Sequence, residues 1–185
     1  MGTVTSHEAL ALRWAELCND TLLHDLPGKI ELNAYGVIEM SPASNRHGIK
    51  QAAISRALAD QLPAGTAIIE CSIATTEGVR VPDVAWASSA FMARHGDVTP
   101  FPAAPDICVE VRSPSNTDAE MEFKTALFLA AGAIEVWIVD EAGQRQVFDA
   151  PIGSIICSFN TCGSGRRQTC RAASASKFTR TSLYL

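Results

Sequence analysis

The sequence lacks the features that mark membrane, secreted or zinc-binding proteins. Its longest apolar run, residues 127–139, is broken by Glu135 and is too short to cross a bilayer. The first residues, MGTVTSHEALALRW, contain no basic segment followed by an apolar run, so we expect no signal peptide. The six cysteines show no zinc-like pairing. We therefore expect a cytoplasmic protein with free thiols and no membrane partner.

Acidic residues are missing from the end of the chain. Residues 1–150 hold all twenty acids and ten bases, which gives a charge of −10, whereas residues 151–185 hold five bases and no acid. The 185 residues are 47% hydrophobic and 19% charged, which is typical of one globular domain with a sizeable core. The net charge of −5 argues mildly against nucleic acid as a partner. Carboxylates that hold divalent cations would reverse this local field.

Hydrophobic periodicity and turn residues predict an α/β fold. The order of elements favours a mixed β-sheet flanked by helices, with an N-terminal helix and a β-hairpin. We expect helices at 7–17, 46–62, 89–94 and 118–131, a hairpin at 29–40 that turns near Tyr35 and Gly36, and strands at 67–74, 79–87, 107–112, 135–140 and 144–148. Ser6 is placed to cap the first helix, Pro63 to stop the second and Gly132 to end the last.

An acid interrupts the apolar strand in the segment PDICVEVRSPS. Because side chains alternate along a strand, Ile107, Val109 and Val111 share one face. Glu110 and Arg112 share the other face, which we expect to point into a cleft or solvent. An unpaired carboxylate within an apolar strand is costly unless something binds it. A bound cation is the interpretation we favour, and an ion pair with Arg112 is the alternative.

A second acid, Asp83, follows Pro82 on the preceding strand. Taken alone, Asp83 is more typical of a strand end. If the two strands are neighbours, however, the carboxylates of Asp83 and Glu110 could converge on one point. Two carboxylates, with water and phosphate oxygens as the other ligands, are what Mg²⁺ favours. Such an ion polarises a phosphate and lowers the pKa of bound water.

Several stretches together resemble the Uma family of bacterial proteins, which are classed as candidate restriction endonucleases of the PD-(D/E)XK superfamily. They are IEL, EMSP, VPDVAW, PDICVEVRSPS, KTALF and GAIEVWIVD, and the resemblance covers roughly residues 7–149. The run VEVRSPS followed by the lysine helix is fairly specific, whereas PD alone has almost no value. The resemblance implies a restriction-endonuclease-like core and cleavage of DNA that depends on Mg²⁺, with Mn²⁺ as an alternative ion.

The resemblance also implies roles for individual residues. Asp83 matches the first acid of the family and Glu110 the second, so both would bind the metal. Arg112 stands where the superfamily has its strand lysine, and Lys124 on the following helix takes over that role. A guanidinium stays charged, whereas the pKa of an ammonium falls in an apolar site, so Lys124 suits proton transfer better and Arg112 would stabilise phosphate charge. The alternative for Lys124 is a surface pair with Glu120.

Three further residues are candidates for supporting roles. Glu31 resembles a recurrent acid of the family and would add a ligand or a hydrogen bond. His47 lies on the apolar stripe of its helix with Gln51, Ile54 and Leu58, so a core histidine is the simpler interpretation. Glu70 would also support the site, although an acid on a strand surface is the simpler interpretation. The family's acidic hairpin turn is replaced here by residues 34–36.

The chain is expected to divide into a nuclease-like domain, residues 1–150, and a basic tail containing Ser and Cys, residues 151–185. The tail has no clear strand period, which suggests a reading-frame change near residue 150; a DNA-gripping tail is the alternative. The endonuclease has two rivals: a catalytically inactive nucleic-acid-binding or dimerisation module of the same fold, and a domain that binds an anionic ligand. We expect DNA as the partner, and a homodimer is compatible with these features.

Overall fold

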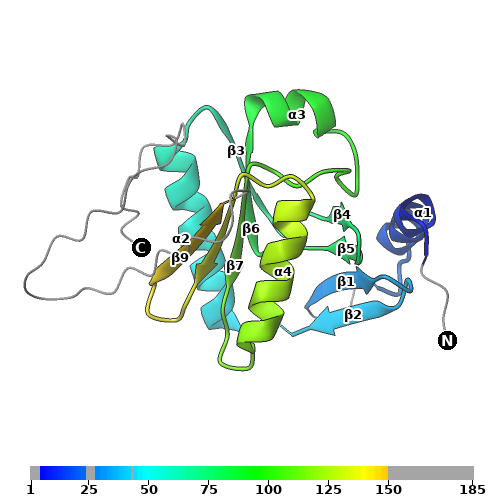
Figure 1. The fold of residues 1–185 in the computed structure, drawn as a ribbon, viewed down its shortest axis with the longest axis horizontal. Helices are drawn as coiled ribbons and strands as arrows, with labels where there is room; N and C mark the ends of the chain where they lie inside the picture. The colour runs from blue at the N-terminus through cyan, green and yellow to red at the C-terminus, as the bar shows by residue number, and fades with distance from the viewer. Residues whose placement is uncertain (1–4, 24–27, 43, 150–185) are drawn as a thin grey trace, which may run out of the picture.

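The computed structural model describes residues 5–23, 28–42 and 44–149, in which four helices and nine strands occur (Figure 1). The helices are α1 (His7–Cys18), α2 (Asn45–Gln61), α3 (Ser89–His95) and α4 (Asp118–Ala130). The strands are β1 (Lys29–Asn33), β2 (Ile38–Ser41), β3 (Gly65–Ile69), β4 (Ile73–Thr75), β5 (Gly78–Arg80), β6 (Val84–Ser88), β7 (Ile107–Val111), β8 (Glu135–Val139) and β9 (Arg145–Asp149).

The nine strands form two sheets. The larger has the order β3-β6-β7-β8-β9 and is mixed, because β7 and β8 run parallel whereas the other neighbours are antiparallel. The smaller has the order β2-β1-β5-β4 and is antiparallel throughout. The predicted mixed sheet flanked by helices and the N-terminal hairpin are confirmed, and the second sheet is an addition to that prediction.

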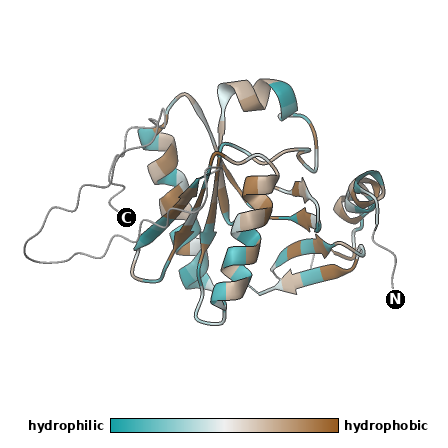
Figure 2. Cartoon of the chain, in the orientation of Figure 1, coloured by the Kyte–Doolittle hydropathy of each residue, from teal (hydrophilic) through white to brown (hydrophobic). Residues whose placement is uncertain are grey.

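Helices cover both faces of the larger sheet, so its central strands are buried on both sides. On one face α2 places Ile54 and Leu58 against Val84 and Val109. The opposite face is covered by α3 and α4, which contribute Phe91 and Phe128 to a second cluster. Figure 2 shows the hydrophobic colouring of the central strands. Every residue of β7 is buried, as expected for a strand covered on both faces.

The first helix packs on the smaller sheet rather than on the larger one. Its apolar stripe of Leu10, Trp14 and Leu17 lies against Leu32 and Val79. Ser6 caps α1 by accepting a hydrogen bond from the Ala9 N–H, as the sequence predicts. Figure 1 shows α1 and the smaller sheet together on one side of the molecule.

Two of the predicted strands are wrong in their extent, because each divides between the sheets. The segment 67–74 splits into β3 and β4, and the segment 79–87 splits into β5 and β6. The first break contains Glu70 with a left-handed φ of 54°. The second contains Pro82, which has no N–H for a strand ladder. The chain therefore crosses between the sheets twice, and the second crossing carries Asp83.

The remaining predicted elements agree with the structure to within a few residues. Gly132, expected to end the last helix, has a φ of 107° just beyond the cap of α4. None of the helices in the described ranges is long and apolar enough to pass through a bilayer. The proposed tail, residues 151–185, and the reading-frame hypothesis lie outside the described residues.

Candidate metal-dependent nuclease site

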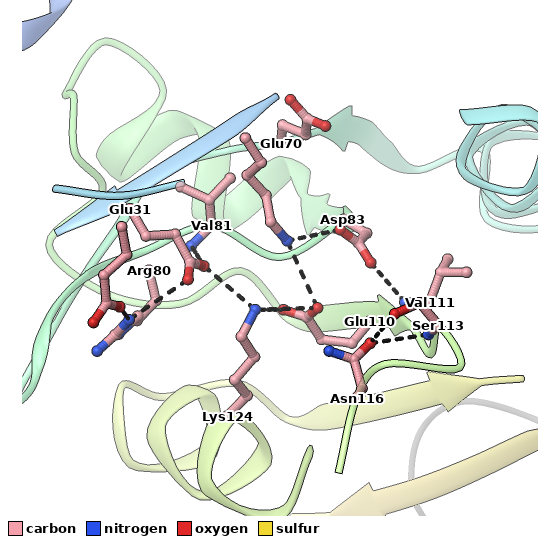
Figure 3. A network of polar contacts seen from close by, with 12 residues as sticks. Glu31, Glu70, Arg80, Val81, Asp83, Glu110, Val111, Ser113, Asn116 and Lys124 are labelled. Atoms are coloured by element: carbon pink, nitrogen blue, oxygen red, sulfur yellow. Dashed lines mark hydrogen bonds and ion pairs between the residues drawn. The ribbon is translucent and has the colours of Figure 1, made fainter. Parts of the chain in front are cut away.

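A cluster of charged side chains lies where the two sheets meet (Figure 3). It draws on β1, on the crossing between β5 and β6, on β7, and on the helices α2 and α4. In the β6–β7 ladder Val84 pairs with Val109. Because β6 and β7 are antiparallel, the residue before Val84 comes beside the residue after Val109, and these are Asp83 and Glu110. Strand pairing therefore brings the two predicted acids together, as the sequence suggested.

Asp83 is 1% exposed and both of its carboxylate oxygens have partners. One oxygen, Oδ2, accepts a 2.7 Å hydrogen bond from the Val111 N–H. The other, Oδ1, lies 2.7 Å from Lys29 Nζ and 3.2 Å from His47 Nε2. Burial alone would raise the pKa of Asp83, but the hydrogen bond with His47 and the charge of Lys29 outweigh burial and lower this pKa. Asp83 is thus held as an ionised carboxylate.

Glu110 is 3% exposed, and its carboxylate has only long contacts with cations. Lys124 Nζ lies 3.3 and 3.5 Å from its two oxygens, and Lys29 Nζ lies 3.7 Å from Oε2. Burial raises the pKa of Glu110 to about 7 and the repulsion from Asp83 adds to this rise, because the distant charges of Lys29 and Lys124 do not compensate for the lost hydration. Glu110 is therefore buried inside the protein. The prediction that it points into a cleft or solvent is wrong.

Lys124 points from α4 into the charged cluster. Its ammonium lies 3.5 Å from Glu31 Oε1 in addition to its contacts with Glu110. The predicted alternative, a surface pair with Glu120, is not formed as an ion pair: Glu120 accepts a 2.7 Å hydrogen bond from the Thr117 N–H in a capping box.

Glu31 contacts both Lys124 and the segment that crosses between β5 and β6. Its Oε1 atom accepts a 2.9 Å hydrogen bond from the Val81 N–H, and its Oε2 atom lies 3.5 Å from Arg80 NH1. Glu31 is itself buried. Figure 3 shows Glu31, Lys124 and Glu110 in contact. The predicted supporting acid is therefore part of the cluster, where it contacts Lys124 and the chain leading to Asp83.

Lys29 is the residue that sequence reasoning missed. Its ammonium contacts both Asp83 and Glu110, and its side chain is 11% exposed. The carboxylates of Glu110 and Asp83 raise the pKa of Lys29, outweighing the opposing effect of burial. The available signal was the spacing of Lys29 and Glu31, which puts both on one face of β1. The partner Asp83 is 54 residues away, and no local pattern indicates it.

The other two predicted supporting residues lie on the α2 side of the cluster. His47 contacts Asp83 directly and is partly exposed, so it is not the core histidine that its helical stripe favours. Glu70 is exposed and accepts a 3.1 Å hydrogen bond from Gln51 Nε2. The same amide lies 3.4 Å from the carbonyl oxygen of Asp83. The Glu70 carboxylate therefore reaches the site through Gln51, and the Glu70 backbone N–H donates a 3.3 Å hydrogen bond to the Asp83 carbonyl oxygen.

Arg112 lies outside the cluster. Its guanidinium pairs with Asp118 at the start of α4 and not with Glu110. With His47 it lines a pocket whose other basic residues are Arg46 and Lys50. The structure therefore separates the two predicted cations, with Lys124 beside the carboxylates and Arg112 at the neighbouring pocket.

No group of three or more His, Cys, Asp or Glu side chains suited to a metal ion occurs in residues 5–23, 28–42 and 44–149. A two-carboxylate site is still chemically reasonable for Mg²⁺, which keeps several waters and often uses one or two carboxylates. Asp83 and Glu110 meet this requirement, because their buried oxygens already share one cation, the Lys29 ammonium. The residues present therefore fit a hard divalent ion.

The sequence of residues 20–154 matches the model of the Uma2 family, described as "Putative restriction endonuclease". The chain belongs to the Uma2 family. A search of curated proteins gives no significant match. Among solved structures, the chain is similar to a putative nuclease of the DUF820 group from Anabaena variabilis ATCC 29413, with 17% identity, 74% of this chain and 82% of that chain covered, and a TM-score of 0.59.

Membership in Uma2 confirms the resemblance found in the sequence, and the structural match shows the restriction-endonuclease-like fold. The family and the fold together support a nuclease function for this Uma2 protein. The matched range, residues 20–154, contains the whole charged cluster.

Proposed function

We propose that this protein is a DNA endonuclease that depends on Mg²⁺, or on Mn²⁺, and that Asp83 and Glu110 hold the ion. One observation carries the proposal. Two buried carboxylates, one from the β5–β6 crossing and one from β7, converge on one cation, and a lysine from α4 stands 3.3 Å from one of them. Without a bound ligand such a buried collection of charges is costly, which favours a functional explanation for it.

Different residues of the chain have different roles in the proposed cleavage. When bound, a divalent ion polarises the phosphate and lowers the pKa of bound water. Asp83 and Glu110 supply oxygen ligands, and the Val111 N–H fixes the orientation of Asp83. Lys124, held between Glu110 and Glu31, presents an ammonium that stabilises negative charge on the phosphate.

DNA is the substrate we propose, despite the acidic character of the chain. The pocket beside the cluster brings together Arg46, Lys50 and Arg112, with Glu141 as its one acidic lining residue. Cationic side chains at this position suit the phosphate backbone on either side of the cleaved bond. Arg112 would then bind substrate next to the reacting phosphate, which is a smaller role than that of Lys124.

Nicking of supercoiled plasmid by the purified protein tests the function. We expect conversion to open-circular and linear DNA with Mg²⁺ or Mn²⁺, and no conversion in EDTA, because the carboxylates need an ion to act on phosphate. Cleavage that continues in EDTA, or no cleavage with either ion, would contradict the proposal.

The second candidate is a nucleic-acid-binding or dimerisation module of the same fold without catalysis. The Lys29 contact favours it, because an ammonium already occupies the point on which the acid pair converges. Calorimetric titration with Mn²⁺ separates the two candidates. An endonuclease should bind the ion in a manner that requires Asp83 and Glu110, whereas a binding module should show no such site.

A further inference from the structure

We propose that Lys29 competes with the divalent ion for Asp83 and Glu110, and so sets how tightly the protein binds metal. This inference rests on the proposed function, because it assigns a role to Lys29 in the same metal site. Lys29 Nζ lies 2.7 Å from Asp83 Oδ1 and 3.7 Å from Glu110 Oε2. The ammonium thus stands at the point on which both carboxylates converge, where a shared ion would bind.

The buried acids of the cluster already have cationic partners without a metal. Glu31, Asp83 and Glu110 are its three buried acids; Lys29, Lys124 and Arg80 contact them, and the His47 imidazole lies 3.2 Å from Asp83 Oδ1. A divalent ion added to this set would meet the Lys29 ammonium at close range. Repulsion between two cations is strong in a buried site of low dielectric constant. Binding of the ion therefore requires the Lys29 ammonium to withdraw.

The position of Lys29 allows this withdrawal. Lys29 is the first residue of β1 and its backbone pairs with Ser41 of β2, whereas the ladder between β1 and β5, on its other side, begins only at Leu32. Its side chain keeps 11% exposure and has a flexible four-carbon stem that can swing toward solvent. Lys124 differs, because it contacts Glu110 and Glu31 and not Asp83. Lys124 is therefore suited to stay in place beside a bound ion.

Competition predicts opposite effects on two measurable properties. Without metal, Lys29 offsets the repulsion between two buried carboxylates, so its neutral variants should be less stable in EDTA. With metal, the same variants no longer have an ammonium to displace, so they should bind the ion more tightly. If Lys29 only supported the fold, its neutral variants would be less stable but would bind the metal no more tightly than the wild type.

The test is calorimetric Mn²⁺ titration of the full chain without DNA, together with thermal unfolding in EDTA and in Mn²⁺. We expect Lys29→Met and Lys29→Gln to bind Mn²⁺ about tenfold more tightly or better, a gain of the size that removing one close charge produces. Both should unfold at a lower temperature than the wild type in EDTA and gain more from Mn²⁺. Lys29→Arg keeps the charge and should bind Mn²⁺ no more tightly than the wild type.

The matched control is Arg56→Gln, which removes the same charge from the exposed face of α2, where Arg56 pairs with Asp60. Its Mn²⁺ affinity should equal that of the wild type. If Lys29→Met does not fold, the comparison of Lys29→Gln with Lys29→Arg decides. Neutral variants with unchanged or weaker Mn²⁺ affinity would overturn the inference, even if the wild type cleaves DNA. Tighter Mn²⁺ binding by those variants, in a protein that never nicks plasmid, would support the competition and reject only the nuclease proposal.

Discussion

At the scale of single residues, the site depends on where each charge lies rather than on how many charges the sequence contains. Lys124 and Arg112 are both candidate cations in the sequence, but only Lys124 contacts the acids. Its ammonium lies 3.3 Å from Glu110, whereas the guanidinium of Arg112 pairs with Asp118. This geometry supports our proposal that Lys124 rather than Arg112 is the cation of the reaction, which agrees with the preference stated from side-chain chemistry.

Lys124→Ala should lower turnover of plasmid DNA by about two to three orders of magnitude, because it removes the charge that stabilises the reacting phosphate. Arg112→Ala should lower turnover by less and should act mainly on DNA binding. The measurement is single-turnover nicking with Mg²⁺ at several DNA concentrations. A greater loss of turnover in Arg112→Ala would mean that the arginine is the principal cation at the phosphate.

His47 supplies a prediction about pH. The hydrogen bond with Asp83 raises the pKa of His47 above its ordinary value of 6.5. The native state therefore favours the protonated imidazole, and this contact stabilises the fold below pH 6.5. The stabilisation is lost as the pH rises through the pKa of the folded state.

In metal-free protein, NMR titration of the His47 imidazole should show a midpoint above 6.5. Asp83→Asn should lower the midpoint, because the carboxylate charge is removed. A wild-type midpoint at or below 6.5, or one that Asp83→Asn leaves unchanged, would show that the contact with Asp83 is not formed in solution.

At the scale of secondary structure, the sequence predicts helices better than the breaks in strands. Helix ends carry local signals, such as Ser6 before α1 and Gly132 after α4. The two predicted strands are divided at Pro82 and at Glu70. Pro82 is a local signal for a break, but the alternating apolar residues around it concealed this signal. The sequence around Glu70 contains no local signal for its left-handed backbone. Two sheets instead of one follow from these breaks.

The presence or absence of local sequence signals also explains which parts of the site could be predicted. Asp83 and Glu110 follow from adjacent strands, and Lys124 follows from the family resemblance. The contact of Lys29 with the acids could not be predicted, because β1 belongs to the other sheet and meets the acids only in the folded chain. The burial of Asp83 was also missed. The sequence indicated an acid typical of a strand end, whereas Asp83→Ala would leave the Val111 N–H and Lys29 without the acceptor that Asp83 provides.

Gly28 positions the start of β1 and so the Lys29 side chain. Its φ is +108°, and a Cβ added there would lie 2.4 Å from the Ser41 carbonyl oxygen. Gly28→Ala should therefore lower the free energy of unfolding by about 1–3 kcal/mol. Gly48→Ala on α2 is the control, because its added Cβ meets nothing within 4 Å and alanine favours a helix. Urea unfolding measures both, and equal stabilities of the two variants would show that β1 begins differently in solution.

At the scale of the whole molecule, the domain proposal separates residues 1–150 from the basic tail, residues 151–185. The tail lies outside the described residues, and its composition carries the proposal: five bases, no acids and no strand period. Limited proteolysis should cut first near Gly163 to Arg171 and leave a fragment that ends near Phe148 or Asp149. Amide exchange as slow in residues 155–180 as in residues 105–112 would instead make the tail part of the core.

Dependence of DNA cleavage on Asp83 tests the central claim most directly. Asp83→Asn is the suitable variant, because its amide oxygen still accepts the Val111 N–H while the metal-binding charge is removed. Asp60→Asn, an equal change on the exposed face of α2, is the control. The assay is single-turnover nicking of supercoiled plasmid with Mg²⁺, in which wild type and Asp60→Asn should cleave at the same rate. The cleavage rate of Asp83→Asn should be lower by about two or more orders of magnitude, as expected for loss of a metal ligand. A folded Asp83→Asn protein that cleaves at the wild-type rate would contradict the account.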